Sequence, residues 1–485
     1  MDRASTVDHG LAAGSVRMTV ARAGAGRQLR VAAPVAQALS DFEGTCCETA
    51  EGSVLEGPLS SRNAAAVRER AWWLSPRPLG LRTSAGVGDR LGLATAGHVR
   101  AFRQHGEGLG AVFAQQSARE MQRLGRSPQQ VLDDATFGCV EQGWTLQVGA
   151  DADHLKTTSD VDSCIDATFS MFTLDPGDHV RHAPERPSQA NLAQVPWADL
   201  EDDAESLRRR YVGTSLDVGD EVRDVEEGDV LRAVVKYGAA VAHTVQLYRH
   251  LMERARHPVE VEVAVDETDE VTTVFEHHFM VRELLRLGVR LVSFAPRYVG
   301  GFEKGVDYVG RLAPFVESLS RHAHVARSLG PYKLSLHSGS DKFRLYPPAV
   351  EATGGLVHLK TSGTSYLEAL RVAAECEPTL FREIYGVSRE AYRGARASYT
   401  VSADLDRAPQ AGDVADEQLM HLVTSPDTRQ MLHVGYGAVL TDRDVSGATW
   451  LDRALRQLLH REAERYADYL EAHLGQHLQP FARPA

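Results

Sequence analysis

Short apolar runs rich in β-branched residues recur along the middle of the chain, and polar side chains follow most of them. Helical stretches come after several of these runs, as in chains where strands and helices alternate. This alternation predicts a parallel sheet, and eight strands within about 290 residues predict a closed (β/α)8 barrel of the TIM type. The expected strands span residues 79–83, 110–116, 145–151, 171–175, 259–267, 290–297, 332–338 and 355–361.

The segments that flank or interrupt the strands of the expected barrel domain (residues 77–365) have other patterns. Residues 1–76 carry short apolar runs broken by Gly and Ala, which predict a small N-terminal α/β lead-in. Residues 183–227, after the fourth strand, are rich in Pro, Asp and Glu and predict an insertion or lid. Amphipathic stretches after the last strand predict a helical C-terminal extension over residues 366–485.

Composition and charge narrow the class of protein. The chain has 485 residues, 43% of them hydrophobic, and a formal net charge of −13, which argues against nucleic acid as a partner. No run of 18 apolar residues occurs, so we expect no membrane span. Five cysteines without a CxxC pair, and an N-terminus without an apolar signal segment, favour the reducing cytoplasm. These features leave a homo-oligomer open.

Histidines and carboxylates fall near the ends of the expected strands. In such a barrel the active site lies at the carboxyl ends of the strands, so residues distant in sequence meet there. We place His154, His337 and His358 at the ends of three strands, and Asp153 beside the first of them. Imidazole and carboxylate are common ligands of zinc, manganese, nickel and iron. These residues are therefore candidates for binding one divalent metal ion.

Two adjacent carboxylates, Asp266 and Glu267, end the most strand-like run of the chain, residues 259–265. Successive side chains of a strand point to opposite faces of the sheet. We therefore expect only one of these two carboxylates to face the active site, and the periodicity does not decide which one.

Several basic side chains also follow, or lie in, the later strands. Arg297, Lys304, Lys342 and Lys360 are candidates for binding a carboxylate or phosphate, since Arg pairs with it in a bidentate manner and Lys acts as a point charge. We assign Gln116, at the end of the second strand, to the same substrate site. The expected partner is thus a small molecule.

Long segments of the chain resemble the bacterial tagaturonate/fructuronate epimerase family. The resemblance covers most of the chain from about residue 80 to 440, whereas the N-terminal 75 residues and the insertion match poorly. The segments that carry it are residues 82–92, 113–120, 131–136, 149–154, 174–180, 335–343, 352–355 and 360–368.

This resemblance implies a divalent-metal-dependent enzyme that interconverts D-tagaturonate and D-fructuronate, which are ketohexuronates. It implies that His154 and His337 are metal ligands and that Asp153 and Glu267 are the acid/base pair, with Glu267 as an alternative ligand. We add His358 as the third ligand from its expected strand position.

The position of the inverted carbon restricts the chemistry. Tagaturonate and fructuronate differ at a hydroxyl-bearing carbon that is β to the ketone and β to the carboxylate, so its hydrogen is not acidic and enolisation cannot invert it. Transient oxidation would need a nicotinamide, for which the sequence has no credible fingerprint. We therefore expect retro-aldol cleavage, rotation of the aldehyde and re-addition, assisted by the metal.

Other functions stay open at this point. A metal-dependent ketose epimerase, an aldose–ketose isomerase or a class II aldolase would use similar residues on a neutral or acidic sugar. A sugar-acid-binding protein without catalytic activity is a further alternative. The native metal, the third ligand, the choice between uronate and neutral ketose, and the role of residues 183–227 are also left open.

Overall fold

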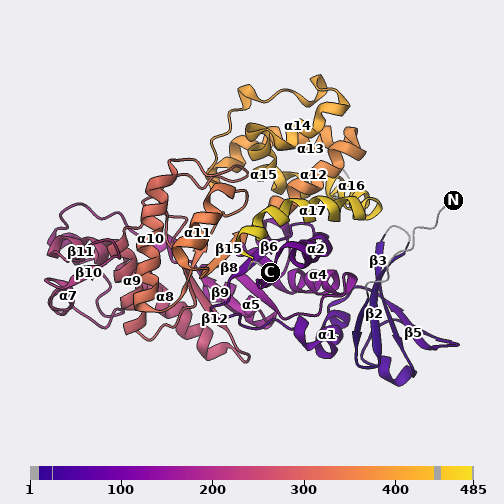
Figure 1. Ribbon diagram of the computed structural model, residues 1–485, viewed down its shortest axis with the longest axis horizontal. Helices are drawn as coiled ribbons and strands as arrows, with labels where there is room; N and C mark the ends of the chain where they lie inside the picture. Colours follow the sequence, from indigo (N-terminus) through magenta and orange to yellow (C-terminus); the bar gives the residue numbers. More distant parts are fainter. Residues whose placement is uncertain (1–9, 24–25, 442–448, 483–485) are drawn as a thin grey trace.

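The centre of the molecule is a closed barrel of eight parallel strands, which confirms the predicted fold class (Figure 1). The computed structural model describes residues 10–23, 26–441 and 449–482. Around the barrel, each strand is hydrogen-bonded to the next in the sequence, and the last pairs with the first. The strands are β6 (Ser84–Gly88), β7 (Gly110–Ser117), β8 (Val148–Leu155), β9 (Met171–Leu174), β12 (Glu260–Ala264), β13 (Ser293–Ala295), β14 (Lys333–Leu336) and β15 (Val357–Thr361).

The first barrel strand lies five residues later than predicted. Residues 79–83 form a loop before β6, where the backbone N–H groups of Leu79 and Gly80 donate hydrogen bonds to Glu260 at 3.0 and 2.7 Å. The sequence of β6, Ser-Ala-Gly-Val-Gly, carries little β-branched character, so its pattern does not stand out. The other seven predicted strands overlap observed ones.

Helices surround the barrel and occupy most connections between its strands. The insertion after β9 contains two short helices and a hairpin, and the long helix α8 follows it. These elements are α2 (Thr95–His105), α3 (Ala118–Leu124), α4 (Pro128–Glu141), α5 (Thr158–Asp166), α6 (Gln189–Leu192), α7 (Ala204–Tyr211), β10 (Ser215–Asp217), β11 (Val222–Asp224), α8 (Glu227–Arg254), α9 (Val274–Arg286), α10 (Leu312–Leu329) and α11 (Tyr346–Thr353).

The N-terminal segment forms an antiparallel sheet of five strands and one helix, to one side of the barrel in Figure 1. Short connections join its strands as hairpins, so their pairing is antiparallel and not the parallel pairing of an alternating α/β unit. The elements are β1 (Leu11–Ala13), β2 (Val16–Ala23), β3 (Gly26–Ala33), β4 (Thr45–Thr49), β5 (Gly52–Gly57) and α1 (Ser61–Arg70).

The C-terminal part is helical and packs beside the barrel, with a hydrophobic cluster of its own (Figure 1). Residues 450–478 form two helices that meet at Glu462. Among the described residues, no helix is long and apolar enough to cross a membrane. The helices are α12 (Thr364–Cys376), α13 (Pro378–Ala395), α14 (Leu419–Thr424), α15 (Pro426–Thr441), α16 (Trp450–Arg461) and α17 (Ala463–Leu478).

Candidate active site

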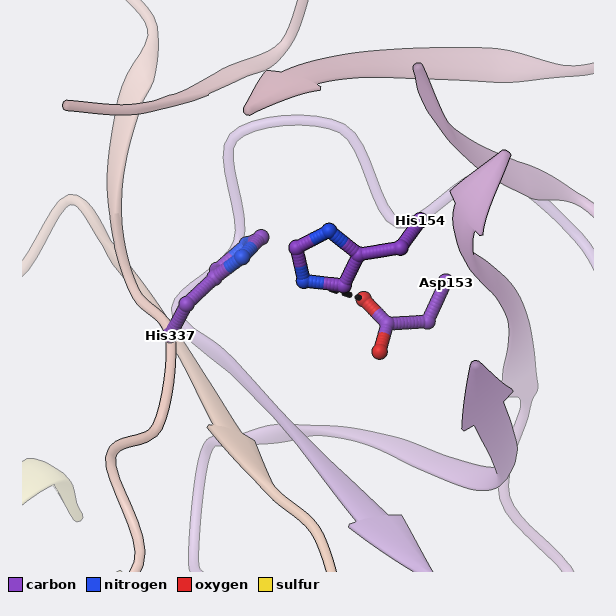
Figure 2. A group of neighbouring side chains, drawn as sticks. All are labelled: Asp153, His154 and His337. Carbon is purple, nitrogen blue, oxygen red and sulfur yellow. Dashed lines mark ion pairs between the residues drawn. The ribbon is translucent and has the colours of Figure 1, made fainter. Parts of the chain in front are cut away.

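Three of the predicted site residues meet at the carboxyl ends of the barrel strands (Figure 2). Asp153 and His154 lie near the C-terminal end of β8, and His337 follows the last residue of β14 directly. The backbone of His154 has a φ of 55°, which breaks the alternation of β8 and lets neighbouring side chains share one side. The rings of His154 and His337 lie 5.0 Å apart, and Asp153 Oδ1 lies 3.7 Å from His154 Nε2.

Acidic side chains surround both imidazoles. His337 Nε2 lies 2.6 Å from Glu262 Oε1, and its Nδ1 lies 2.9 Å from Asp266 Oδ1. Burial alone would lower the pKa of His337, but the negative charges of Asp266 and Glu262 raise it to about 9. His154 Nδ1 lies 3.1 Å from Asp175 Oδ2, which orients the ring from the end of β9.

The pKa of His154 is raised well above its ordinary value. Burial opposes this shift, and the charges of Asp153 and Glu267 outweigh burial. A metal ion bound to His154 would displace this proton, because an imidazole that ligates a metal must be neutral.

Lys360 stands at the centre of a cluster of buried carboxylates. Its Nζ lies 2.8 Å from an oxygen of each of Asp151, Asp153 and Glu262. Burial would lower the pKa of Lys360, but the charges of these carboxylates hold it well above its ordinary value. This lysine, predicted to bind substrate, is thus engaged with the protein's own carboxylates.

Both predicted acid/base residues are ionised at neutral pH. Burial would raise the pKa of Asp153, and the charges of Lys360 and His154 outweigh it, so the pKa lies well below its usual range. For Glu267 burial acts in the same direction, yet the charges of His154, Lys304 and Arg119 lower its pKa to about 2. Each carboxylate is therefore ready to accept a proton.

Asp266 and Glu267 line the same cavity, contrary to the expectation that only one of them faces the site. Strand β12 ends at Ala264, so strand alternation no longer applies to these residues and the following loop turns both toward the opening. Glu267 pairs with Arg119 at 3.0 and 3.2 Å in a bidentate geometry.

The cavity beside these residues has a volume of about 420 Å³. Its walls come from the loops after β12 and β13 and from residues 397–400 of the helical extension. Arg297, predicted to bind substrate, lines it together with Lys304 and Arg119. The volume falls in the range of small-molecule sites, and the basic side chains suit an anionic ligand.

The structure brings three other predicted residues neither to this cavity nor to the small recess that Asp153, His154 and Lys360 line. His358 is the second residue of β15, not its last, and its Nδ1 lies 2.8 Å from Ser84 Oγ in the barrel interior. It sits one inward position before Lys360 and belongs to none of the candidate metal-ligand groups found among the described residues. The expectation that His358 ends a strand is therefore wrong, because the strand continues past it.

Gln116 and Lys342 support the surrounding loops. The Oε1 of Gln116 accepts a hydrogen bond from Arg126 at 3.0 Å, and its neighbour Gln115 faces the site instead. Lys342 donates to backbone carbonyls of three residues, including Glu303 at 2.8 Å, and burial lowers its pKa to about 8. Its ammonium group thus holds two loops together.

Sequence reasoning missed several contributors to the site. Glu262 lies inside an apolar run in which glutamates alternate with valines, and this alternation could have indicated a charge that faces the barrel interior. Arg119 starts the helix after β7, and Tyr399 comes from the helical extension, where no periodicity points to the barrel.

Unpaired polar atoms mark the centre of the site. Among the described residues, Glu262 Oε2, Asp266 Oδ1 and His337 Nδ1 are buried and make no hydrogen bond, although the last two approach each other. Leaving such an atom unpaired costs about 1–3 kcal/mol. One ligand atom from each of Asp153, His154 and His337 lies within 4.8 Å of the others. Imidazole nitrogens and carboxylate oxygens in this arrangement fit a divalent metal ion.

Known proteins share both the sequence and the fold of this chain. The sequence profile of the tagaturonate epimerase family, UxaE, matches residues 15–481. A tagaturonate/fructuronate epimerase of Thermotoga maritima is 41% identical over 411 residues, which are 84% of this chain and 82% of that protein. Crystal structures of the fructuronate-tagaturonate epimerase UxaE from Cohnella laeviribosi, native and with one glycerol, have a TM-score of 0.87 and 30% identity, covering 97% of this chain and 94% of theirs.

Proposed function

The chain belongs to the tagaturonate epimerase family, and we propose that it interconverts D-tagaturonate and D-fructuronate with one divalent metal ion. The observation that carries the proposal is that two imidazoles, of His154 and His337, lie beside two ionised carboxylates, of Asp153 and Glu267. Asp153 shares one candidate metal group with both imidazoles, and Glu267 shares another with His154. A site of this composition has metal ligands and proton acceptors in one place.

We propose that His154 and His337 hold the metal ion and leave Asp153 and Glu267 to move protons. Carboxylates are numerous around this place, which favours a cation. When bound, the ion would polarise the substrate ketone and offset the charge that develops on its oxygen, which is worth several kcal/mol. These carboxylates are Asp151, Asp153, Asp175, Glu262, Asp266 and Glu267.

The residues of the site then act on the proton of the hydroxyl group at the inverted carbon, C4. One carboxylate takes this proton while the C3–C4 bond breaks, and the bonding electrons move into the C2–C3 bond beside the ketone. The C4 aldehyde turns, and C3 adds to its other face. The accepted proton passes to the second carboxylate, which returns it to the oxygen of the new hydroxyl group.

Asp153 and Glu267 are the proposed proton carriers. The C4 hydroxyl groups of the two epimers point to opposite faces, so a separate group would serve each of them. Both carboxylates are ionised, so either can accept the proton first, and the group that accepts it in one direction donates it in the reverse direction.

The experiment is turnover of D-tagaturonate by the purified chain, followed by NMR, before and after removal and return of the metal. Formation of D-fructuronate that stops with a chelator and resumes with zinc, manganese, nickel or iron supports the proposal. A net accumulation of three-carbon fragments would instead indicate an aldolase, and binding without turnover would indicate a sugar-acid-binding protein. Purification with tightly bound nicotinamide would contradict the retro-aldol route.

We also propose that the enzyme acts in the cytoplasm. All five cysteines are free thiols, and two of them, Cys46 and Cys47, are exposed, which suits a reducing compartment.

A further inference from the structure

Four basic side chains line the cavity or the small recess around Asp153, His154 and His337, and two of them differ from the others in their partners. Arg119 is paired with Glu267, and Lys360 is paired with three carboxylates. Arg297 and Lys304 have no ion-pair partner in the part of the chain that the structure describes. Their charge is therefore available to a ligand.

Of these two, Lys304 lies closer to the candidate catalytic group. It lines the large cavity and also the small recess that contains Asp153, His154 and His337, whereas Arg297 lines only the cavity. Its Nζ donates a hydrogen bond of 2.6 Å to the hydroxyl of Ser338, the residue that follows His337.

The loop that carries Lys304 is fixed by the helical extension. The backbone N–H of Lys304 donates to the carbonyl of Thr400, a residue of the cavity wall. The preceding carboxylate, Glu303, accepts hydrogen bonds from Ser402 at 2.6 Å and from Gln430 at 2.7 Å. The ammonium group thus starts from a backbone held on both sides, which lowers the entropy cost of binding a ligand.

The chemistry of the substrate explains why a cation is needed at the position of Lys304. In a ketohexuronate the carboxylate carbon is C6, which is bonded to C5, and C5 is bonded to the inverted C4. A cation that binds the carboxylate oxygens therefore lies about 6 Å from C4. After cleavage the carboxylate is on the aldehyde fragment. A cation that holds the carboxylate keeps this fragment in place while its aldehyde turns about the C4–C5 bond.

We infer that Lys304 binds the substrate carboxylate and determines the preference for ketohexuronates over neutral ketoses; this inference rests on the proposed function. Ser338 positions the ammonium group between the cavity and the recess. A charge-assisted hydrogen bond of this kind contributes a factor of about 10 to 100 in affinity.

The test compares charge removal at Lys304 with charge removal at Arg297. Lys304→Met is expected to lower kcat/KM for D-tagaturonate about 10- to 100-fold, and Lys304→Arg should restore much of it. Calorimetry with D-glycerate, a stable analogue of the acid fragment, and with its neutral counterpart glycerol separates charge recognition from a change of shape. Lys304→Met should weaken binding of glycerate and leave binding of glycerol unchanged.

Three results would overturn the inference: unchanged kcat/KM and glycerate affinity in Lys304→Met, equal weakening of glycerate and glycerol, or a charge-specific loss in Arg297→Met that exceeds the loss in Lys304→Met. Thermal unfolding of each variant shows whether its fold is intact. Failure of the proposed function is distinguishable, because then the wild-type chain does not epimerise tagaturonate, whereas glycerate binding is measured without turnover.

Discussion

Removal of the buried charge of Lys360 tests how much this lysine stabilises the negatively charged carboxylates of the barrel interior. The ammonium group lies 2.8 Å from three carboxylate oxygens, and the four side chains are between 0% and 8% exposed. In Lys360→Met the carboxylates lose their common counter-charge. Breaking a buried ion pair by removing one partner costs about 3–5 kcal/mol, so we expect the free energy of unfolding at pH 7 to fall by about that amount.

The pH dependence of this loss follows from the carboxylates. The pKa values of Asp153 and Glu262 are lowered in the folded protein despite burial, largely by Lys360. A lowered carboxyl pKa contributes stability above the unfolded value, about 4, and that contribution is lost as the pH falls through the folded value. The variant lacks this contribution, so the difference from wild type should be full above about pH 5 and shrink below pH 4.

The assay is urea unfolding at pH 7 and at about pH 3, followed by far-UV circular dichroism, with EDTA present to exclude metal. Lys156→Met is the matched control, because the Lys156 side chain is 41% exposed and its nearer partner, at 2.7 Å, is the exposed Asp178, with Asp175 at 3.8 Å. A surface pair of this kind contributes about 0–1 kcal/mol. Equal unfolding midpoints for the two lysine variants at pH 7, or a loss in Lys360→Met that does not change with pH, would refute the reasoning.

Further predictions concern the proposed catalytic and metal-binding residues. Glu267→Gln should lower kcat for epimerisation by about 100- to 10,000-fold without changing metal content, as measured by NMR and metal analysis; full activity would contradict its role. His337→Ala should remove most of the bound metal after gel filtration, and Asp175→Asn should weaken metal affinity by about 10- to 100-fold, because it orients His154. Arg119→Met should raise the pKa of Glu267, so the acidic limb of kcat/KM should move to higher pH; an unmoved limb would assign that limb to another group.

The barrel was predictable because its strands have a strong local signal. Seven apolar runs indicated strands that the structure contains, and a closed barrel follows from their number and their alternation with helices. The first strand was misplaced because β6 is made of small residues, and its conformation depends on neighbouring strands more than on its own propensity.

The centre of the site was predictable from strand ends, and its outer parts were not. His154 and His337 lie at the carboxyl ends of barrel strands, as expected for active-site residues. To place His358 correctly, one would have to know where β15 ends, and the sequence pattern does not show this. The shared orientation of Asp266 and Glu267 depends on a loop, to which strand periodicity does not apply. The wall at residues 397–400 comes from distant helices, whose docking no local pattern encodes.

The fate of the hydrogen at the inverted carbon tests the proposed chemistry most directly. D-tagaturonate labelled with deuterium at C4 is converted by the metal-loaded enzyme, and NMR follows the label while rates are compared with unlabelled substrate. Retro-aldol chemistry breaks the C3–C4 bond and leaves the C4–H bond intact, so it predicts D-fructuronate that retains deuterium at C4 and nearly equal rates for the two substrates. Loss of deuterium to water, or a large primary isotope effect, would contradict it.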